Sequence, residues 1–299
     1  MSATRPRRSL LYMPASNPRA LEKAKALLAD GFIFDLEDAV APEQKPAARS
    51  AAVQAAQSGS YGAREVLIRV NGLGTQWAEA DLAAVAQSGA DGVVLPKVSS
   101  AADIEVAARI LLRSGAPSTL ALWAMIETPR GVQAVDAIAD GNQTQGIPKL
   151  AGIIIGTADL AKELRCHHPV DRAPMLYALS RCVLAARASG ISVIDGPHFH
   201  LDDEEGLTAS CQQGRALGFD GKSLIHPKQI AIANAAYSPS ADELSSAQRI
   251  VAAYQQARSE GRGIVTVEGR LIEALHVQQA ERLLREAALI SQLAESVKT

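Results

Sequence analysis

Cysteine and aromatic residues are scarce in this chain. Its three cysteines, Cys166, Cys182 and Cys211, are odd in number and form no CxxC pair, so neither a disulfide framework nor a zinc knuckle is indicated. Aromatic residues make up 4% of the sequence, and none alternates with basic residues as in the stacking platforms of single-stranded nucleic-acid binders. Nucleic acid is therefore not an expected ligand.

The chain also lacks a strong charge of one sign and any long apolar run. The net charge is −2, and the small basic cluster of Arg5, Arg7 and Arg8 is best interpreted as a solvated tail. No apolar run reaches the roughly 20 residues of a membrane span, and the first residues are too polar for a signal peptide. We expect a cytoplasmic protein with no membrane partner.

Three motifs of common enzyme classes are missing as well. No GxGxxG follows an apolar run and no GxxxxGK[ST] occurs, so the phosphate cradles of nicotinamide-binding and P-loop proteins are absent. No GxSxG elbow supports a nucleophilic serine, although spacing alone does not exclude a Ser-His-Asp arrangement.

What the chain does contain is a series of eight apolar runs of strand length. Several are apolar throughout, which is typical of strands covered on both faces, and helical patterns separate them. The pattern predicts a (β/α)8 TIM barrel and disfavours a doubly wound open sheet, which needs no polar residue after every strand. The runs are residues 8–13, 32–36, 65–70, 92–96, 120–126, 150–156, 191–195 and 219–225.

A helical extension follows the predicted barrel. We expect a catalytic barrel domain over 1–237 and a C-terminal extension over 238–299. The extension begins with a capped helix near Ser238, continues through a short β segment at 263–269, and ends in a long amphipathic helix from 270 onward. Such an extension packs on a neighbouring subunit or covers its own barrel.

Charged or amide residues end nearly every apolar run. Loops after the carboxyl ends of barrel strands all open on one face, so these side chains are expected to converge there. They are Asp35, Glu37, Arg69, Asn71, Lys97, Glu127, Asp159, Asp195 and Lys222.

Glu127 and Asp159 end the fifth and sixth runs. Adjacent strand ends lie side by side, so the two carboxylates can share one cation, and hard oxygen ligands favour Mg²⁺ over zinc. The alternative is a salt bridge at the barrel rim for each acid. A second metal site, formed by His198, His200 and Asp195, is a weaker hypothesis than polar packing of the two histidines.

Arg69 follows the third run, where its guanidinium suits bidentate capture of a carboxylate or a developing oxyanion. Its alternative role is to pair with the acids of the preceding loop. That loop places Asp35, Glu37 and Asp38 within four residues, which is more negative charge than a rim needs without a cation or an arginine partner. At least one of them is expected to support the metal or its waters.

Seven segments in this order resemble the citrate lyase β-subunit-like family of acyl-CoA lyases, relatives of the malyl-CoA and citramalyl-CoA lyases. The resemblance runs from about Arg8 to about Leu284. It rests on RSLLYMPASNPRALEKA, FDLEDAVAPEQKPAAR, IRVNG, GVVLPKV, IETPRGV, GTADLA and DGKSLIHPKQIAIANAAYSPSADELSSAQRI.

The resemblance implies a TIM barrel assembled as a homotrimer or homohexamer. It implies a Mg²⁺-dependent carbon–carbon lyase that acts on a 3-hydroxyacyl-CoA with a free carboxylate and yields an acyl-CoA and a 2-oxo acid. Glu127 and Asp159 look like the Mg²⁺ ligands. Catalytic roles are expected for Arg69, Glu273, Asp38 and Glu37, and substrate contacts for Arg69, Pro96, Lys97, Thr157 and Arg8.

Glu273 departs from the family pattern. Related lyases carry an aspartate at this position, which reaches in from a neighbouring subunit to act on the α-carbon of the thioester. One extra methylene in GRLIEALH displaces the carboxyl group, and a misplacement of about 1 Å costs roughly a hundredfold in rate. Two alternatives therefore stay open: an aldolase acting on a free hydroxy-oxo-acid, and a subunit that needs an acyl-carrier protein.

Overall fold

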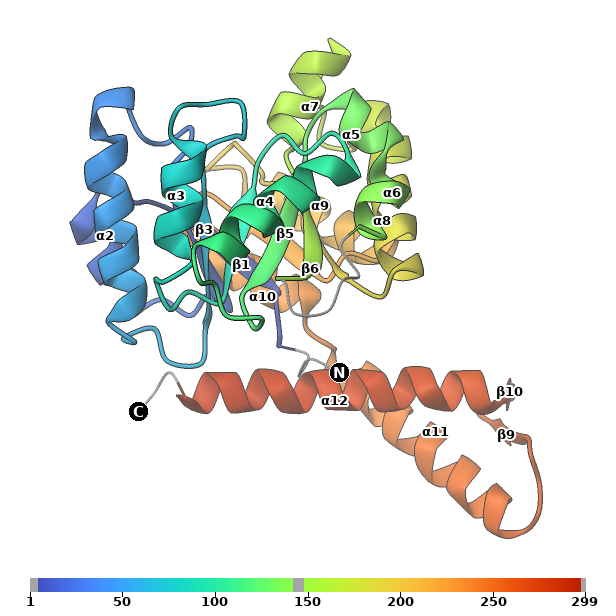
Figure 1. Ribbon diagram of the computed structural model, residues 1–299. Coiled ribbons are helices and arrows are strands. Elements are labelled where there is room, and N and C mark those ends of the chain that lie inside the picture. The colour runs from blue at the N-terminus through green and yellow to red at the C-terminus, as the bar shows by residue number, and fades with distance from the viewer. Residues whose placement is uncertain (1–4, 142–147, 297–299) are drawn as a thin grey trace. The chain divides into compact units, whose positions relative to one another are not determined.

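The computed structural model describes residues 5–141 and 148–296 of the chain. Eight parallel strands close into a barrel in chain order, with β1 paired to β8. This confirms the predicted TIM barrel. The strands are β1 (Ser9–Pro14), β2 (Gly31–Asp35), β3 (Glu65–Arg69), β4 (Gly92–Leu95), β5 (Ala121–Ile126), β6 (Leu150–Ile155), β7 (Ser192–Asp195) and β8 (Gly221–Leu224). Figure 1 shows strands β1, β3, β5 and β6 among the helices that flank them.

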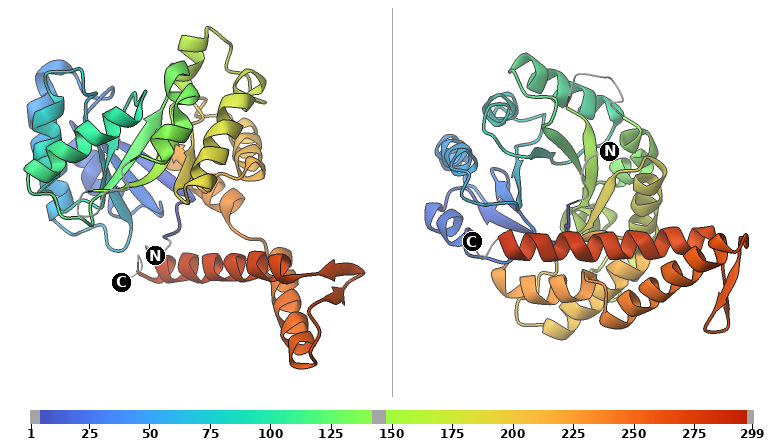
Figure 2. Two further views of the ribbon diagram at one scale, coloured as in Figure 1. Left: turned by 45° about the vertical axis from the view of Figure 1, so that its right-hand side comes forward. Right: turned by 90° about the horizontal axis from the view of Figure 1, so that it is seen from below.

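Helices surround the strands, as the view from below in Figure 2 shows. They are α1 (Pro18–Ala24), α2 (Lys45–Gln57), α3 (Ala78–Val85), α4 (Ala101–Arg113), α5 (Pro129–Gln133), α6 (Val135–Ala139), α7 (Thr157–Leu164), α8 (Leu176–Ala188), α9 (Glu204–Leu217) and α10 (Ile230–Tyr237), with 3₁₀ turns at 42–44, 173–175 and 227–229. Two helices, the short α7 and the longer α8, lie between β6 and β7.

The barrel interior is filled by apolar side chains that alternate along the strands. Successive residues of a strand point to opposite faces, so residues two positions beyond an interior side chain also point inward. Asp35 follows interior Ile33 in this way, and Glu127 follows interior Met125. The interior cluster consists of Leu10, Ile33, Leu67, Val94, Trp123, Met125, Ile154 and Ile194.

The chain divides into two compact units, one spanning Arg7–Tyr237 and the other including the segment from Ser238 onward. The second unit contains α11 (Ala241–Ser259), β9 (Val265–Val267), β10 (Arg270–Ile272) and α12 (Ala274–Ser296), and α11 contacts α12. The predicted cap is present: Ser240 and Glu243 form a capping box at the start of α11.

The start of the last helix differs from its prediction. Arg270–Ile272 pair in antiparallel register with Val265–Val267, so this stretch is a strand and α12 begins only at Ala274. The apolar residues at 271 and 272 are compatible with a helix or with a strand. The turn at Glu268 and Gly269, where both residues have positive φ, favours a β-hairpin.

None of the helices within 5–141 and 148–296 combines the length and the apolar character that a membrane span requires.

Candidate functional site

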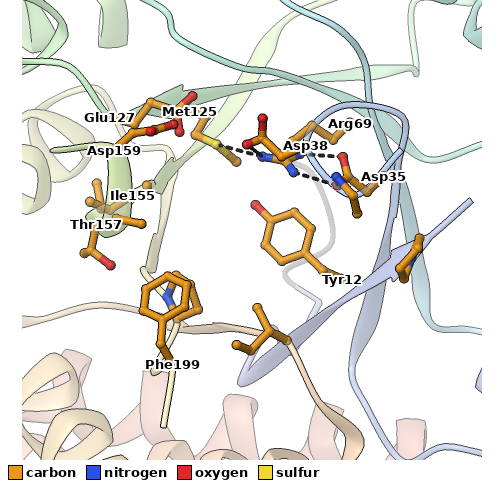
Figure 3. A pocket seen from close by; sticks show the side chains of 16 residues that line it. Tyr12, Asp35, Asp38, Arg69, Met125, Glu127, Ile155, Thr157, Asp159 and Phe199 are labelled. Atoms are coloured by element: carbon orange, nitrogen blue, oxygen red, sulfur yellow. Dashed lines mark hydrogen bonds and ion pairs between the residues drawn. The ribbon is translucent and has the colours of Figure 1, made fainter. Parts of the chain in front are cut away.

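A cavity of about 390 Å³ opens at the carboxyl ends of the barrel strands. Its walls come from β1, β2, β3, β5 and the loops after β6, β7 and β8, so the barrel closure itself assembles it. Figure 3 shows acidic side chains and one arginine on its upper side, with Tyr12 and Phe199 below them. The labelled lining residues are Tyr12, Asp35, Asp38, Arg69, Met125, Glu127, Ile155, Thr157, Asp159 and Phe199.

Glu127 and Asp159 lie next to each other, as the sequence predicted, with their carboxylates close together (Figure 3). Glu127 directly follows β5 and is 3% exposed, whereas Asp159 lies in the first turn of α7. Gly156 makes room for this approach, because a Cβ atom there would lie 2.4 Å from Glu127 Oε2. The carboxylate of Glu127 therefore occupies space that a larger residue at 156 would fill.

The electrostatic surroundings of Glu127 favour a bound cation. Burial, together with the negative charges of Glu37 and Asp159, raises the pKa of this carboxyl to about 8. One opposing contact is the backbone N–H of Lys97, which donates to Glu127 Oε1 at 2.8 Å. Lys97 has a φ of 55°, a left-handed conformation that is uncommon for a lysine. A divalent cation between Glu127 and Asp159 would offset the repulsion.

Arg69 projects inward from the end of β3 and is held by Asp35. Its Nε donates to Asp35 Oδ1 at 2.7 Å and its Nη2 to Asp35 Oδ2 at 2.6 Å. The ring of Tyr12 lies 5.0 Å from the guanidinium carbon. Burial alone lowers the pKa of Arg69, but Asp35 outweighs it, so the pKa lies well above its usual value. Arg69 is thus a fixed cation, and its Nη1 remains directed toward the other acids.

Glu37 and Lys97 extend the polar network of Arg69 beyond the cavity wall. Nη1 of Arg69 lies 3.0 Å from Glu37 Oε2, and Nζ of Lys97 donates to Glu37 Oε1 at 2.6 Å. Burial also raises the pKa of Glu37. Asp38 is exposed and lies 3.6 Å from Arg69 Nη1. Acids exceed cations here, because among the described residues Arg69 and Lys97 are the cations that face the five acids Asp35, Glu37, Asp38, Glu127 and Asp159.

The predicted substrate contacts differ in their placement. Thr157 lines the cavity, and its buried Oγ1 has no hydrogen-bond partner among the described residues. Pro96 is buried beside Lys97, and neither residue is part of the cavity wall. Arg8 precedes β1, at the opposite end of the barrel, where it is paired with Asp30 at 2.7 Å. The structure does not bring Arg8 to the cavity.

The predicted convergence is wrong for Asp195 and Lys222. Asp195 is adjacent to interior Ile194, so its side chain points outward, toward the helices. There Asp195 pairs with Arg172 at 2.6 Å and with Lys222 at 2.8 Å. Asn71 is also committed elsewhere, to Lys45 and Asp81.

Because Asp195 faces outward, it is also unavailable to the second metal site predicted from His198, His200 and Asp195. The rings of His198 and His200 lie 5.8 Å apart. In the described part of the chain, no group of three or more His, Cys, Asp or Glu side chains could hold a metal ion. The two histidines instead line a second cavity.

Sequence reasoning missed the apolar side of the first cavity. Tyr12, Met125 and Phe199 line it, and their chemistry carries no catalytic signal. Strand alternation could have found Tyr12, which lies two residues beyond interior Leu10.

Glu273 lies in the second unit, between β10 and α12. Its backbone N–H donates to Nδ1 of His276 at 3.0 Å, which fixes the start of the last helix. Its catalytic role stays a prediction.

Comparisons with known proteins identify relatives of this chain. The sequence model of the HpcH/HpaI aldolase/citrate lyase family matches residues 8–227. A (3S)-malyl-CoA thioesterase of Cereibacter sphaeroides is 46% identical over 286 residues, which cover 96% of each chain. The citrate lyase subunit β of Leuconostoc mesenteroides is 34% identical over 292 residues, covering 96% of this chain and 95% of its own.

Solved structures of relatives have the same fold. CitE of Mycobacterium tuberculosis, in complex with magnesium, acetoacetate and coenzyme A, superposes with a TM-score of 0.74 at 33% identity and covers 96% of this chain and 99% of its own. The citrate lyase β subunit of M. tuberculosis with oxaloacetate and magnesium gives a TM-score of 0.66 at 34% identity, covering 79% of this chain and 98% of its own. The expected resemblance is confirmed, and the chain belongs to the HpcH/HpaI aldolase/citrate lyase family.

Proposed function

We propose that this protein is a Mg²⁺-dependent carbon–carbon lyase. Its proposed substrate is a 3-hydroxyacyl-CoA with a free carboxylate, such as malyl-CoA or citramalyl-CoA, which it cleaves to, or condenses from, an acyl-CoA and a 2-oxo acid. The observation that carries the proposal is the excess of acids around one anchored arginine in the cavity. Family membership supports CoA-linked chemistry, since relatives are a malyl-CoA thioesterase and citrate lyase β subunits.

Glu127 and Asp159 are the residues proposed to hold the metal. Their donor set fits Mg²⁺, because two carboxylates leave room for water and substrate oxygens around a hard cation. Relatives of this chain bind magnesium together with acetoacetate or oxaloacetate. When bound, the metal supplies a Lewis acid that polarises substrate oxygens.

Arg69 is proposed to bind the free carboxylate or the oxo oxygen of the substrate. Asp35 occupies Nε and Nη2, whereas Nη1 contacts Glu37 and also Met125, which lines the cavity. Nη1 is therefore the nitrogen proposed to face the substrate. Because Asp35 and Tyr12 hold the guanidinium in place, little reorganisation is needed when negative charge develops beside it. Thr157, whose buried hydroxyl has no partner among the described residues, is proposed as a second donor to the substrate.

Proton transfer needs a further group near the α-carbon of the thioester. We propose Glu273 of a neighbouring subunit for this role, in a homotrimer or homohexamer. Glu37 and Asp38 contact Nη1 of Arg69, whereas Asp35 contacts Nε and Nη2. They are proposed to orient water and to stabilise the arginine.

An assay of purified protein with Mg²⁺ and malyl-CoA or citramalyl-CoA tests the proposal. Release of glyoxylate or pyruvate, trapped as a hydrazone, is the readout. Glu127→Gln and Arg69→Ala are expected to lower kcat/KM by roughly a hundredfold or more. The matched control is Glu163→Gln on α7, an exposed acid outside the cavity, which should leave the rate unchanged. Full activity of Glu127→Gln would refute the proposal.

Thioester hydrolysis is a second candidate, favoured by the relative that is 46% identical. The two reactions share a substrate but differ in products. Hydrolysis releases a free thiol and a hydroxy acid, whereas cleavage releases a 2-oxo acid and keeps the thioester intact. Following thiol and 2-oxo acid in one time course separates them, since hydrolysis alone yields thiol without 2-oxo acid. Turnover only with an acyl-carrier thioester would instead indicate a partner-dependent subunit.

A further inference from the structure

A second cavity of about 350 Å³ lies beside the first. It is enclosed by the 158–172 segment and the 198–210 segment, and it shares only Ala158 and Phe199 with the first cavity. Figure 3 shows Phe199 on the side of the first cavity away from Arg69 and Asp35. The ring of Phe199 packs edge-on against His168, with 6.1 Å between ring centroids. Phe199 therefore forms a wall between the two cavities.

The two cavities have opposite chemical character. The first is rich in carboxylates, whereas no aspartate or glutamate of the described chain lines the second. Every polar side chain of the second cavity is a hydrogen-bond donor or can become one: Arg172, Ser210, His168, His198 and His200. The remaining walls are apolar, with Ala161, Pro169 and Val170 among them. Such a lining suits a ligand that only accepts hydrogen bonds.

Buried charge beneath the second cavity strengthens this preference. Arg172, Asp195 and Lys222 are 2%, 0% and 0% exposed. Arg172 Nη1 donates to both oxygens of Asp195, at 2.6 and 2.7 Å, and Lys222 Nζ donates to Oδ2 at 2.8 Å. Burial lowers the pKa of Lys222, and the negative charge of Asp195 opposes this shift. With Lys222 protonated, two cations share one carboxylate, which leaves a surplus of positive charge in a region of low dielectric.

Ser210 connects the buried charges to the second cavity, because it contacts Lys222 and lines the cavity wall. Its Oγ accepts a hydrogen bond from Lys222 Nζ at 2.8 Å, so the hydroxyl proton is free to point elsewhere. Within the described residues this proton has no acceptor, and Ser210 is 4% exposed. Nη2 of Arg172 donates once, to the Ser210 carbonyl at 3.3 Å, which leaves its second N–H available. Two buried donors are therefore available at the cavity wall.

The histidines complete the donor set. Burial lowers the pKa of His168, and the charges of Arg172 and Lys222 lower it further. His198 is 7% exposed, and its Nε2 makes no hydrogen bond among the described residues. Asp203 Oδ2 lies 3.4 Å from this nitrogen. An anion in the cavity would favour protonation of both rings.

We propose that this second cavity is a binding site for a small aliphatic carboxylate, with Arg172, Ser210 and His198 contacting the carboxylate and Val170 and Phe199 the aliphatic part. The site is separate from the acid-rich cavity and does not depend on the proposed lyase activity. The apolar walls favour a carboxylate with a short chain over inorganic phosphate, which has no apolar part to bury.

Histidine NMR on the intact protein tests the site, with propionate as the probe. His168, His198 and His200 line the second cavity, and the chain contains only six histidines, so their ring signals report on this cavity selectively. Propionate is expected to shift these signals saturably, and inorganic phosphate to bind more weakly. Unsaturable or absent shifts, or tighter binding of phosphate, would overturn the proposal.

A pair of variants at Val170 provides the matched control. Val170 is 50% exposed, and it lines the second cavity but not the first, so substitutions there are compatible with folding. Val170→Asp adds a negative charge and is expected to weaken propionate binding about tenfold or more, whereas neutral Val170→Asn is expected to retain most of it. Ser210→Ala should weaken binding about tenfold because it removes a donor to a charged group. Equal affinities of Val170→Asp and Val170→Asn would overturn the proposal.

Discussion

At the scale of single residues, Glu127 is a buried carboxyl that is repelled by neighbouring acids and packed tightly against the backbone. Its carboxylate sits against Gly156 and accepts a hydrogen bond from the left-handed residue Lys97. Residues held in sparsely populated backbone conformations persist where the surrounding structure supports them. Here the left-handed turn brings a backbone N–H to one oxygen of Glu127, and the other oxygen lies on the side of Gly156.

Glu127 is expected to make the stability of the metal-free protein depend on pH. Its pKa of about 8 in the native state lies above the value of about 4.3 for an unfolded chain. The native state therefore binds the proton more tightly, and this contribution to stability is present at low pH and is lost as the pH rises toward 8. In EDTA, Tm should fall from pH 5 to pH 8.5 more steeply for the native chain than for Glu127→Gln.

Adding Mg²⁺ at pH 8.5 should restore Tm in the native chain and not in Glu127→Gln, because binding to the folded state stabilises it. Parallel Tm curves of the two proteins across this pH range, with and without Mg²⁺, would contradict the assigned role of Glu127.

Gly156→Ala should displace the Glu127 carboxylate. The new Cβ would lie 2.4 Å from Glu127 Oε2 and 2.5 Å from Glu127 Cβ, so the Glu127 side chain must move from its present position. We expect Mg²⁺ affinity, measured by calorimetry, to fall roughly 10- to 100-fold, as for other changes that misorient ligands. Gly72→Ala is the control, because nothing lies within 4 Å of its added Cβ. Equal affinities in the two variants would count against the proposed ligand.

At the scale of elements, the outward faces of β7 and β8 are joined to α9 by buried charges. Asp195 from β7 and Lys222 from β8 meet Ser210 of α9, and Arg172 joins them from the loop before α8. A buried carboxylate that accepts from two cations ties neighbouring strands to the helix layer. This cluster also forms the floor of the second cavity.

Substitutions in this cluster should lower the free energy of unfolding by different amounts, depending on which buried charge they leave unpaired. Asp195→Asn leaves two buried cations without a counter-ion and is expected to destabilise the fold by about 3–5 kcal/mol. Lys222→Met keeps the Arg172–Asp195 pair and fills a similar volume, so its cost should be smaller. Urea unfolding followed by circular dichroism measures both. A larger loss in Lys222→Met than in Asp195→Asn would show that the surplus charge is not where we place it.

At the scale of the whole molecule, the division into two units is the main feature. The unit Arg7–Tyr237 contains the closed sheet and the cavity, and the other unit contains Glu273. The proposed reaction therefore depends on a residue outside the barrel unit. In the proposed homo-oligomer, that residue comes from a neighbouring chain.

Mixed oligomers test this arrangement. Glu273→Gln and Glu127→Gln should each be nearly inactive alone, because each lacks one part of the proposed site. Co-expression of the two variants should restore part of the activity, since some sites then combine an intact barrel with an intact neighbouring Glu273. Glu273→Asp should be active by itself. Failure of the mixture to recover activity above that of the single variants would contradict a shared site.

Much of the barrel was predictable from the sequence because its strands are marked by short apolar runs. The eight predicted runs agree with β1–β8 to within about two residues at each end. The pair Glu127 and Asp159 was predictable for the same reason, since both follow adjacent strands. Helix α7 was not, because its eight residues are too few to show a clear helical periodicity.

By itself, then, the sequence determined which segments are strands, their order in a closed parallel sheet, and which charged residues stand at the strands' carboxyl ends. Only the tertiary structure decided which way those residues point. A strand covered on both faces is apolar on both, so its sequence does not distinguish the barrel interior from the helix layer. Arg69 faces inward to Asp35, whereas Asp195 and Lys222 face outward to Arg172. Because successive strand residues point to opposite faces, the inward-facing residues contribute to the acid-rich cavity and the outward-facing ones lie beneath the second cavity.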